Sequence, residues 1–497
     1  MERELFEHAS FLYALPEDGT AEIVAYTGRE ESVEIPSVLG GRQVTVIGDK
    51  AFYEHKQLRR VVVPQGVAAM GERVFSDCEC LEEAILPDSV RSIGGWTFTR
   101  CRRLTRVTLP RGLADIGEEM FSYCDSLAQL TLPGEVTGIS SYAFSSCVSL
   151  ESITLPDSLL SIGDRAFSEC GSLRSIALPD SLLFVGENPF KRCEALTEIT
   201  VSPDHPALAV VDGVLYSRAE GRLVCCPMAA ETEEPRIPEG TRSIGIDAFD
   251  SCAGLRAVTI PGSVVHISGW AFQHCPGLTD VVIREGVKSI GPCAFFYCGS
   301  LSGLTLPRGL EEIGNRAFHA CESLAEVTLP SGVALGDGVF GECGFLEVTI
   351  PEGVTRMEGR VFEDCESMEH VVLPEGLTRL DHGLFMGCSS LEEIDVPPGV
   401  TEIKARVFSG CESLYRVSLP ESLTEIGSGA FRDCTALTAL TIPAGVRRIG
   451  YNAFTVETDD GLRPLPGLTL AVTPGSLAER YCRDNGLPFV CAGPSAD

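Results

Sequence analysis

The sequence predicts a repeat solenoid, in which one short unit recurs along the chain and its copies stack as a right-handed superhelix. Three observations support this prediction. Phenylalanine recurs in seventeen places at a spacing of 23 residues, shortened twice to 22 and interrupted once by an interval of 59. Cysteine follows this phenylalanine by three residues in fifteen places, and a segment of the form L-x-x-V-x-L-P separates successive copies. We therefore expect a parallel β-sheet with short helical or 3-10 turns, built from about 17 repeats of 23 residues.

The recurrent residues are called the ladder phenylalanines and the ladder cysteines below. The ladder phenylalanines are Phe52, Phe75, Phe98, Phe121, Phe144, Phe167, Phe190, Phe249, Phe272, Phe295, Phe318, Phe340, Phe362, Phe385, Phe408, Phe431 and Phe454. The ladder cysteines are Cys78, Cys101, Cys124, Cys147, Cys170, Cys193, Cys252, Cys275, Cys298, Cys321, Cys343, Cys365, Cys388, Cys411 and Cys434.

The L-x-x-V-x-L-P segment alternates apolar and polar residues, which is typical of a strand with one buried face. In the copy that starts at Leu173, we expect Ile176 and Leu178 to point into the core. Ser175 and Ala177 should then point to solvent. The proline ends the strand, because it has no N–H to donate and restricts the residue before it.

The rest of the repeat is expected to turn. The Ile-Gly step should turn the chain, with Gly163 as an example of the backbone freedom that this requires. The A-F-x-x-C segment should form a short helical turn that places Phe and Cys in the core. A polar residue three before the phenylalanine is placed to cap that turn. Examples are Asp49, Glu118, Ser141, Asp164 and Asn315.

Because one repeat cannot bury its apolar face alone, the stacked copies should form one continuous core. We expect five segments: an N-terminal capping hairpin region (1–44), a first block of repeats (45–203), an inserted β-hairpin island (204–236), a second block (237–460) and a C-terminal cap (461–497).

Turn signals support the two caps and the island. Asp18-Gly19 lies between two apolar segments and predicts a hairpin. Strands at Val214–Tyr216 and Leu223–Cys226 flank a turn that contains Gly221, and we expect this hairpin to project from the array. Near the C-terminus, a strand over 468–472 precedes a helix. Ser476 and Glu479 form a capping-box pattern for this helix, and the following Asn-Gly-Leu-Pro sequence ends it.

The spacing and the I-G-x-x-A-F-x-x-C signature resemble the BspA-like class of leucine-rich repeats, over roughly residues 11 to 490. The resemblance implies a leucine-rich-repeat solenoid. Members of that class are mostly known or inferred surface, adhesive or host-interacting proteins, and they share no catalytic residues. The resemblance thus implies an architecture, a binding role and a secreted or cell-surface location, with no particular ligand.

The cysteines are expected to be structural. Stacked coils would hold the Cα atoms of ladder cysteines about 5 Å apart, within the disulfide range. Their parallel Cβ atoms would also lie about 5 Å apart, however, where a disulfide needs about 3.8 Å. We expect reduced, metal-free thiols that pack as small hydrophobes, with disulfides or a metal ladder as the alternatives. Pairs such as Cys225-Cys226 lack the C-x-x-C spacing of a metal or redox site.

No motif predicts catalysis or a cofactor. The segment 336–341 matches G-x-G-x-x-G, but it contains a ladder phenylalanine and lies outside any βαβ unit. The eight histidines occupy unrelated repeat positions, and no Ser-His-Asp, nucleophile-elbow or phosphate-loop pattern occurs. We therefore expect a protein that is not an enzyme and holds neither cofactor nor metal.

The formal net charge of −31 argues against nucleic-acid binding, which requires clustered Lys and Arg. Acidic residues precede any apolar stretch at the N-terminus, so a signal peptide is not predicted. No segment approaches the roughly 18 apolar residues of a membrane span. From the sequence as written, we expect a cytoplasmic protein.

The outward-facing strand residues are the candidates for binding, because stacking fixes the core and the turns. Acids dominate one outward row in the second block, where they could contact a basic protein surface. The candidate residues on this face are Asp280, Glu326, Glu347, His370, Glu393, Asp395 and Arg416. We expect protein–protein or protein–glycan binding by the extended sheet face. The alternatives are a solvated face without a ligand, binding by the island, a structural or surface-coat protein, and an enzyme whose site the motifs miss. The oligomeric state is left open.

Overall fold

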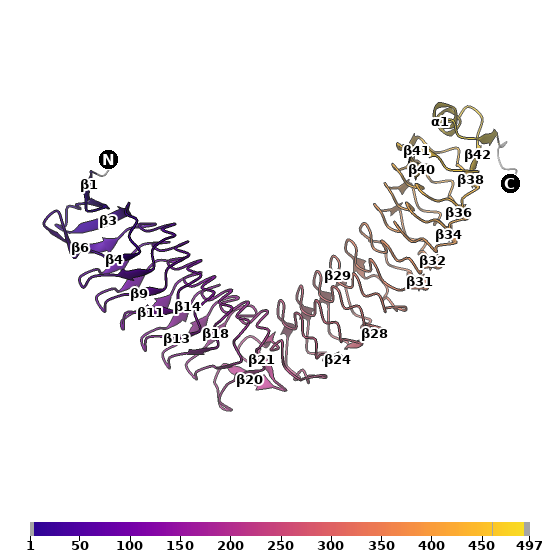
Figure 1. The fold of residues 1–497 in the computed structure, drawn as a ribbon. Coiled ribbons are helices and arrows are strands. Elements are labelled where there is room, and N and C mark those ends of the chain that lie inside the picture. Colours follow the sequence, from indigo (N-terminus) through magenta and orange to yellow (C-terminus); the bar gives the residue numbers. More distant parts are fainter. Residues whose placement is uncertain (1–3, 460, 492–497) are drawn as a thin grey trace. The chain divides into compact units, whose positions relative to one another are not determined.

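Each repeat forms one coil, and most coils carry two short strands and a turn (Figure 1). The computed structural model describes residues 4–459 and 461–491. The coils form two compact units: unit 1 comprises 1–235 and 245–254, and unit 2 comprises 236–244 and 255–497. Strands of successive coils pair in parallel, 23 residues apart, so the chain is a parallel-strand β-solenoid, as predicted.

The first strand of each coil, called the face strand, is the predicted alternating segment. In β17 (Ser175–Ala177) both end residues are exposed and Ile176 is buried, and Leu178 after the strand is buried too. The predicted alternation is confirmed.

In unit 1 the face strands are β4 (Ser32–Glu34), β7 (Arg60–Val62), β9 (Glu83–Ile85), β11 (Arg106–Thr108), β13 (Gln129–Thr131), β15 (Ser152–Thr154), β17 and β19 (Glu198–Thr200). In unit 2 they are β24 (Ala257–Ile260), β26 (Asp280–Ile283), β28 (Gly303–Thr305), β31 (Glu347–Thr349), β32 (His370–Val372), β34 (Glu393–Asp395), β36 (Arg416–Ser418) and β38 (Ala439–Thr441).

A second strand, which the sequence analysis missed, precedes the glycine of the Ile-Gly step. Most of these strands have two residues, too short for any alternation to be visible in the sequence. In unit 1 they are β6 (Arg42–Ile47), β8 (Ala69–Met70), β10 (Ser92–Ile93), β12 (Asp115–Ile116), β14 (Gly138–Ile139), β16 (Ser161–Ile162) and β18 (Phe184–Val185). In unit 2 they are β23 (Ser243–Ile244), β25 (His266–Ile267), β27 (Ser289–Ile290), β29 (Glu312–Ile313), β30 (Ala334–Leu335), β33 (Arg379–Leu380), β35 (Glu402–Ile403), β37 (Glu425–Ile426) and β39 (Arg448–Ile449).

Gly163 was predicted to supply backbone freedom for a turn. The structure shows instead that glycine is required here because two coils stack closely. Its φ is not positive. A Cβ at this position would lie 2.5 Å from the backbone nitrogen of Ser141 in the preceding coil, closer than real Cβ atoms approach. The repeated glycine therefore lets adjacent coils come within strand-pairing distance.

The A-F-x-x-C segment turns as expected, but it is not a regular helix. In the coil of Phe167, Arg165 and Glu169 have φ of 50° and 62°, in the left-handed region, which breaks an α-helix. Their N–H groups and that of Phe167 donate forward to carbonyls of the next coil, over 2.8–3.1 Å. The turn thus satisfies part of its backbone by pairing between coils.

The side chains of Asp49 and Asp164, three before the phenylalanine, accept hydrogen bonds from the next coil, so the prediction that they cap their own turns is wrong. Oδ1 of Asp164 accepts a hydrogen bond from the N–H of Glu187 at 2.8 Å, and Oδ1 of Asp49 accepts one from the N–H of Glu72 at 2.8 Å. Each donor lies 23 residues after its acceptor. These side chains therefore help to join consecutive coils.

The ladder phenylalanines are all buried, as predicted. The rings of neighbouring coils stack face to face. Phe295 lies between Phe272 and Phe318, with ring centroids 4.9 and 5.0 Å away and planes within 2° of parallel. These spacings match the roughly 4.8 Å between paired strands, so the rings and the sheets share one translation per coil.

The ladder cysteines are also buried, as predicted, but they act as more than small hydrophobes. In at least thirteen coils of the described chain, the Sγ atom donates a hydrogen bond to the carbonyl of the ladder phenylalanine in the preceding coil. Cys321, for example, donates to the oxygen of Phe295 at 3.3 Å. Burial raises the pKa of the Cys147 thiol to about 12, which keeps it protonated as a donor.

The N-terminal hairpin around Asp18-Gly19 is present and leads into the first coil. Strands β1 (Leu5–His8), β2 (Phe11–Ala14) and β3 (Ala21–Tyr26) pair antiparallel, and β3 pairs in parallel with β6. The ring of Tyr26 stacks on Phe52, the first ladder phenylalanine, with centroids 5.0 Å apart. A two-residue strand, β5 (Val38–Leu39), folds back on β6.

The C-terminal elements follow the prediction and add to it. Helix α1 (Leu477–Asn485) begins after Ser476, whose hydroxyl accepts from the N–H of Glu479 at 3.2 Å, and ends at Gly486 with φ 67°. Strand β42 (Thr469–Val472) pairs with β38 and with β43 (Phe489–Cys491). The hairpin of β40 (Thr455–Thr458) and β41 (Gly461–Pro464) was not predicted.

The island hairpin is present, but it does not project from the array. Strands β20 (Leu208–Val211), β21 (Val214–Ser217) and β22 (Arg222–Cys225) form an antiparallel meander. All four residues of β21 and the last three of β22 are buried, and several belong to the core cluster of unit 1. Their apolar side chains extend the core where a regular coil is missing.

A buried ion cluster explains why 245–254 belong to unit 1. The Asp247 side chain, 1% exposed, accepts from a guanidinium nitrogen of Arg165 at 2.7 Å and from Nζ of Lys191 at 2.8 Å. The Asn188 side-chain amide donates to the backbone oxygen of Asp247 at 2.6 Å. A buried carboxylate needs such partners, so the cluster holds this segment against the coils that precede the island.

We expect Phe295→Ala to lower the free energy of unfolding by about 3–5 kcal/mol, because the change opens a cavity between two stacked rings. The measurement is equilibrium denaturation in urea. The matched control is Arg308→Ala, an exposed position in the next coil, which should change stability by no more than about 0.5 kcal/mol. A loss below about 1 kcal/mol for Phe295→Ala would contradict the packing described here.

Thiol labelling should separate the ladder cysteines from the exposed thiol. In the native protein we expect Cys491 to react fast, the partly exposed Cys80, Cys226 and Cys293 more slowly, and the ladder cysteines only after unfolding. In denaturant all 21 thiols should react. Cys491→Ser should remove the fast phase alone. Stoichiometric zinc in the purified protein, or fewer than 21 reactive thiols in denaturant, would overturn this assignment.

Candidate functional site

Most of the outward residues predicted on the face of unit 2 lie in one row. Glu347, His370, Glu393 and Arg416 pair in register across β31, β32, β34 and β36. Figure 1 shows these strands along one edge of unit 2, with β29 on the opposite side. The predicted residues thus share a surface because each holds the same place in its coil.

Two predicted residues stand apart from this row. Asp280 is exposed on β26 and pairs with Gly303 of β28, in the sheet β24–β26–β28. Glu326 is exposed but belongs to no strand, because the chain from 324 to 330 is irregular. The structure therefore does not bring the predicted residues together on one continuous sheet.

Arg416 neutralises part of the predicted acidic row. Its guanidinium donates to Oε2 of Glu393 at 2.8 Å and to Oδ1 of Asp395 at 3.0 Å. The hydrogen bond from Arg416 holds the pKa of Glu393 below its ordinary value. Arg416 is the last of the predicted residues in this row, at its C-terminal end.

Two acids on the same face, Glu369 and Glu392, were not predicted from the sequence. Glu369 and Glu392 follow the first apolar residue of their repeats and are exposed. The residue after that leucine or methionine is exposed in most coils, so its position in the repeat was the available signal. The acidic face, as we call it, comprises Glu326, Glu347, Glu369, Glu392, Glu393 and Asp395.

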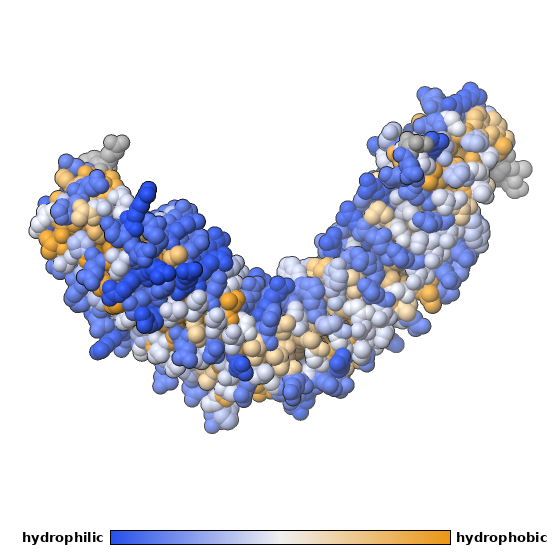
Figure 2. Space-filling view, in the orientation of Figure 1, coloured by the Kyte–Doolittle hydropathy of each residue, from blue (hydrophilic) through white to orange (hydrophobic). Residues whose placement is uncertain are grey.

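Four residues of the acidic face have no ion pair. Across residues 4–459 and 461–491, no Lys, Arg or His lies within salt-bridge distance of Glu326, Glu347, Glu369 or Glu392. Figure 2 shows hydrophilic residues mixed with apolar ones along the edge of unit 2 that carries β31 to β36. The face therefore keeps most of its negative charge.

The face of the first coils of unit 1 is different, because charges there pair with one another. Arg60 and Arg106 both contact the carboxylate of Glu83, at 2.9 and 3.2 Å, and Arg59 lies 3.5 Å from Glu82. These residues hold the same places in their coils as the acidic face does in unit 2. These first coils thus provide a paired surface for comparison, whereas Glu151 and Glu198 further along unit 1 have no ion pair within the described residues.

The sheet of unit 2 is interrupted inside the acidic face. Gly303, Glu326, Glu347 and His370 hold equivalent places in successive coils and are 23, 21 and 23 residues apart. The two missing residues fall on either side of ladder Phe340, one near Leu335 and one after Cys343. The coil is too short here for its strand to pair, and 325–329 forms no strand.

A groove of about 630 Å³ lies at this interruption, between 325–329 and the start of β31. Glu326, Glu347 and Glu369 line it together with Leu346 and Pro351. Leu346 is 55% exposed and gives the groove an apolar surface. Binding sites in proteins commonly have this combination of an apolar lining with a few charged groups.

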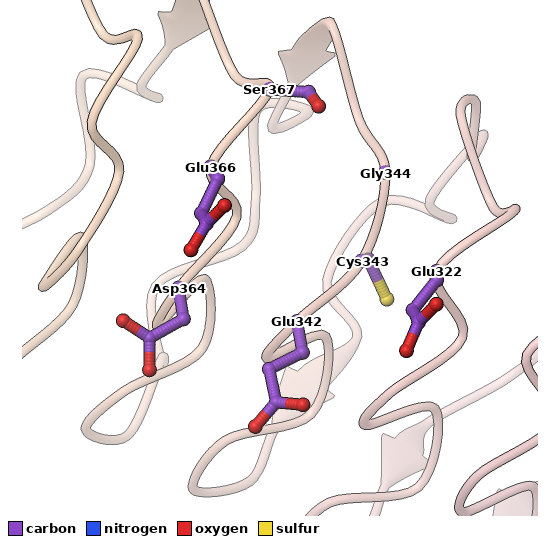
Figure 3. Close-up of a pocket in the computed structure, with 7 residues that line it drawn as sticks. All are labelled: Glu322, Glu342, Cys343, Gly344, Asp364, Glu366 and Ser367. Carbon is purple, nitrogen blue, oxygen red and sulfur yellow. The ribbon is translucent and has the colours of Figure 1, made fainter.

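A second acidic cluster lies on the turn side of the same coils. Figure 3 shows Glu322, Glu342, Asp364 and Glu366, from three successive coils, around a pocket of about 430 Å³. Within the described ranges, no group of three or more His, Cys, Asp or Glu is arranged to hold a metal ion. The four carboxylates around this pocket repel one another.

His319 contacts Glu342, one of the acids that line that pocket. Its Nε2 atom lies 3.3 Å from Oε1 of Glu342, and its ring stacks on Phe296. Burial lowers the pKa of His319, although Glu342 opposes this effect. Burial also raises the pKa of Asp364, and the charges of Glu342 and Glu366 add to that shift.

The chain matches a family model, the BspA type leucine rich repeat region, over residues 25–151, 115–208, 228–344 and 333–458. No protein in a curated set matched the chain. In the part of the chain that the structure describes, no helix has the length and apolar character needed to cross a membrane.

Solved structures of leucine-rich repeat proteins are similar over most of the chain. A leucine rich cell surface protein from Faecalibacterium prausnitzii is 28% identical over 91% of this chain and 95% of its own, with a TM-score of 0.49. A leucine-rich repeat protein from Bacteroides ovatus is 26% identical over 90% and 99%, with a TM-score of 0.44. The pneumococcal vaccine antigen PcpA is 16% identical over 98% of both chains, with a TM-score of 0.36.

We expect Asp364→Asn to raise the melting temperature at pH 7. A raised pKa means that the folded chain binds this proton more readily than the unfolded chain, so the ionised carboxylate costs stability as pH rises through that pKa. Asparagine removes this cost and tolerates the left-handed φ of 54°. The gain should disappear below about pH 3, where aspartate is mostly protonated in both states.

The measurement is the thermal unfolding of the wild type and of Asp364→Asn at a series of pH values between about pH 3 and pH 8. Asp204→Asn, at an exposed position without an ion pair, is the control and should shift the curve little at any pH. A melting temperature that falls at pH 7 for Asp364→Asn would show that the carboxylate stabilises the fold.

Proposed function

The chain belongs to the BspA-type leucine-rich repeat family, and from this we propose that it is a non-catalytic binding protein. Its partner is a protein with a basic surface, which docks on the acidic face of unit 2. The observation that carries this proposal is the contrast between the two units. In the first coils of unit 1 these positions form ion pairs, whereas four carboxylates of the acidic face have none within the described residues.

Stacking gives these charges their effect. Equivalent residues of neighbouring coils are separated by about one strand spacing, roughly 4.8 Å, so like charges on the face repel. A positively charged partner would relieve this repulsion, and the field of the face would speed its approach. Binding should therefore weaken as salt is added.

A protein partner is favoured over the other candidates. The net charge of −31 opposes close packing of identical chains at low salt, which argues against a coat built from this protein alone. A glycan without basic groups would leave the carboxylates unpaired. The meander of β20 to β22 is packed into the core, so it offers less free surface than the face strands do.

A non-catalytic role is supported by the state of the most reactive side chains. The ladder thiols are buried, and most donate to a carbonyl of the preceding coil. A nucleophilic thiol needs a lowered pKa, whereas burial raises these values. Membership of the family supports a place on the cell surface or outside the cell, which immunolabelling of intact cells would test.

We expect the double variant Glu326→Lys and Glu347→Lys to bind its partner roughly tenfold more weakly or worse, because each reversal replaces attraction by repulsion. Proteins captured from surface extracts at low salt are first identified and purified. Their affinity for wild type and variant is then measured by titration calorimetry at two salt concentrations.

The control carries the same change of net charge outside the acidic face, with Glu135→Lys and Asp157→Lys at exposed turns of unit 1. It should bind like the wild type, and all three proteins should unfold at similar temperatures. The proposal fails if affinity ignores both salt and the two reversals on the face.

A further inference from the structure

The interruption in the sheet of unit 2 leaves backbone groups without partners. Within the described chain, no N–H or C=O of 325–329 takes part in a backbone hydrogen bond. Across the groove, β31 pairs with β32 and with no other strand. Backbone groups in folded proteins are nearly always paired or solvated, and an open strand edge is a template for another strand.

The shortened spacing sets this place apart from other sheet boundaries. Between β36 and β38 the sheet also changes, but both segments remain strands and lie 23 residues apart. At 325–329 the strand itself is lost, and the groove of about 630 Å³ lies where the ladder would continue. The break in the sheet therefore coincides with a coil that is two residues shorter than the usual 23.

The lining of the groove fits one kind of strand. Glu326, Glu347 and Glu369 supply three carboxylates, and Leu346 adds an exposed apolar surface. Successive side chains of an extended peptide point to opposite sides. A peptide that alternates basic and apolar residues would direct its cations to the carboxylates and its apolar side chains to the groove.

We propose that this groove binds an extended basic segment of a partner protein by strand addition. The backbone of the segment pairs with the open edge of β31, while its lysines or arginines contact the three glutamates. This inference rests on the proposed function, since it specifies how the basic partner is held. It adds that main-chain hydrogen bonds, and not charge alone, hold the partner.

The test uses the full chain and a defined probe, the blocked peptide Lys-Val-Lys-Val-Lys, with its binding measured by fluorescence anisotropy. A second peptide has the same sequence with both valine nitrogens methylated, which keeps the charge and removes backbone donors. We expect methylation to weaken binding roughly tenfold or more, as the loss of two hydrogen bonds implies.

The possible outcomes separate this inference from the proposed function. Equal binding of both peptides, each weakened by Glu326→Lys and Glu347→Lys, overturns strand addition and leaves a purely electrostatic face. No binding of the first peptide up to about 1 mM also overturns strand addition. Indifference of peptide binding to the two reversals would count against the proposed function itself.

A variant of the protein tests the cause of the groove. Inserting one serine between Gly344 and Phe345 restores the usual C-x-x-L spacing, and should bring β31 towards pairing with 325–329. We expect the first peptide to bind this variant roughly tenfold more weakly. A serine inserted after Glu233, in the polar segment 231–235, is the control and should leave binding unchanged.

Unchanged peptide binding by a folded Gly344 insertion variant would overturn the proposed origin of the groove. If that variant does not unfold cooperatively, the comparison of the two peptides on the wild-type protein decides the question.

Discussion

Face-to-face stacking of the ladder phenylalanines sets the spacing on which the rest of the molecule depends. The centroids of neighbouring rings lie 4.9 to 6.0 Å apart through the regular parts of the ladder. Paired strands need about 4.8 Å, so the ring stack and the two rows of strands fit the same advance per coil. The glycine of the Ile-Gly step allows that approach, and the ladder cysteine satisfies a carbonyl that the turn leaves facing the next coil.

This shared spacing explains why much of the fold could be predicted from the sequence. A position that must stack on its own copy tolerates few residue types, so Phe and Cys mark the coil directly. The two-residue strands such as β16 were missed because they are defined by pairing between coils and leave no alternation within a coil. The role of Asp164 was misjudged for the same reason, since its hydrogen-bond partner lies 23 residues away.

The candidate site was predictable only in part. Its outward positions follow from the strand register, which is why Glu347, His370 and Glu393 were found. Charge pairing does not follow from register alone, because the long side chain of Arg416 reaches acids on the neighbouring strand. The groove arises from two single-residue losses whose combined effect, an unpaired strand, depends on where they fall relative to ladder Phe340.

The N–H groups of each turn donate to the coil that follows in the sequence, so the order of synthesis matters for completing these hydrogen bonds. In the coil of Phe431, Gly429, Phe431 and Asp433 donate to carbonyls of residues 451, 453 and 455, which are made later. During synthesis from the N-terminus, the newest coil always presents unsatisfied donors until its successor leaves the ribosome. Each coil is therefore completed by the next one. A pause in translation would leave a growing end that is chemically ready to add another coil.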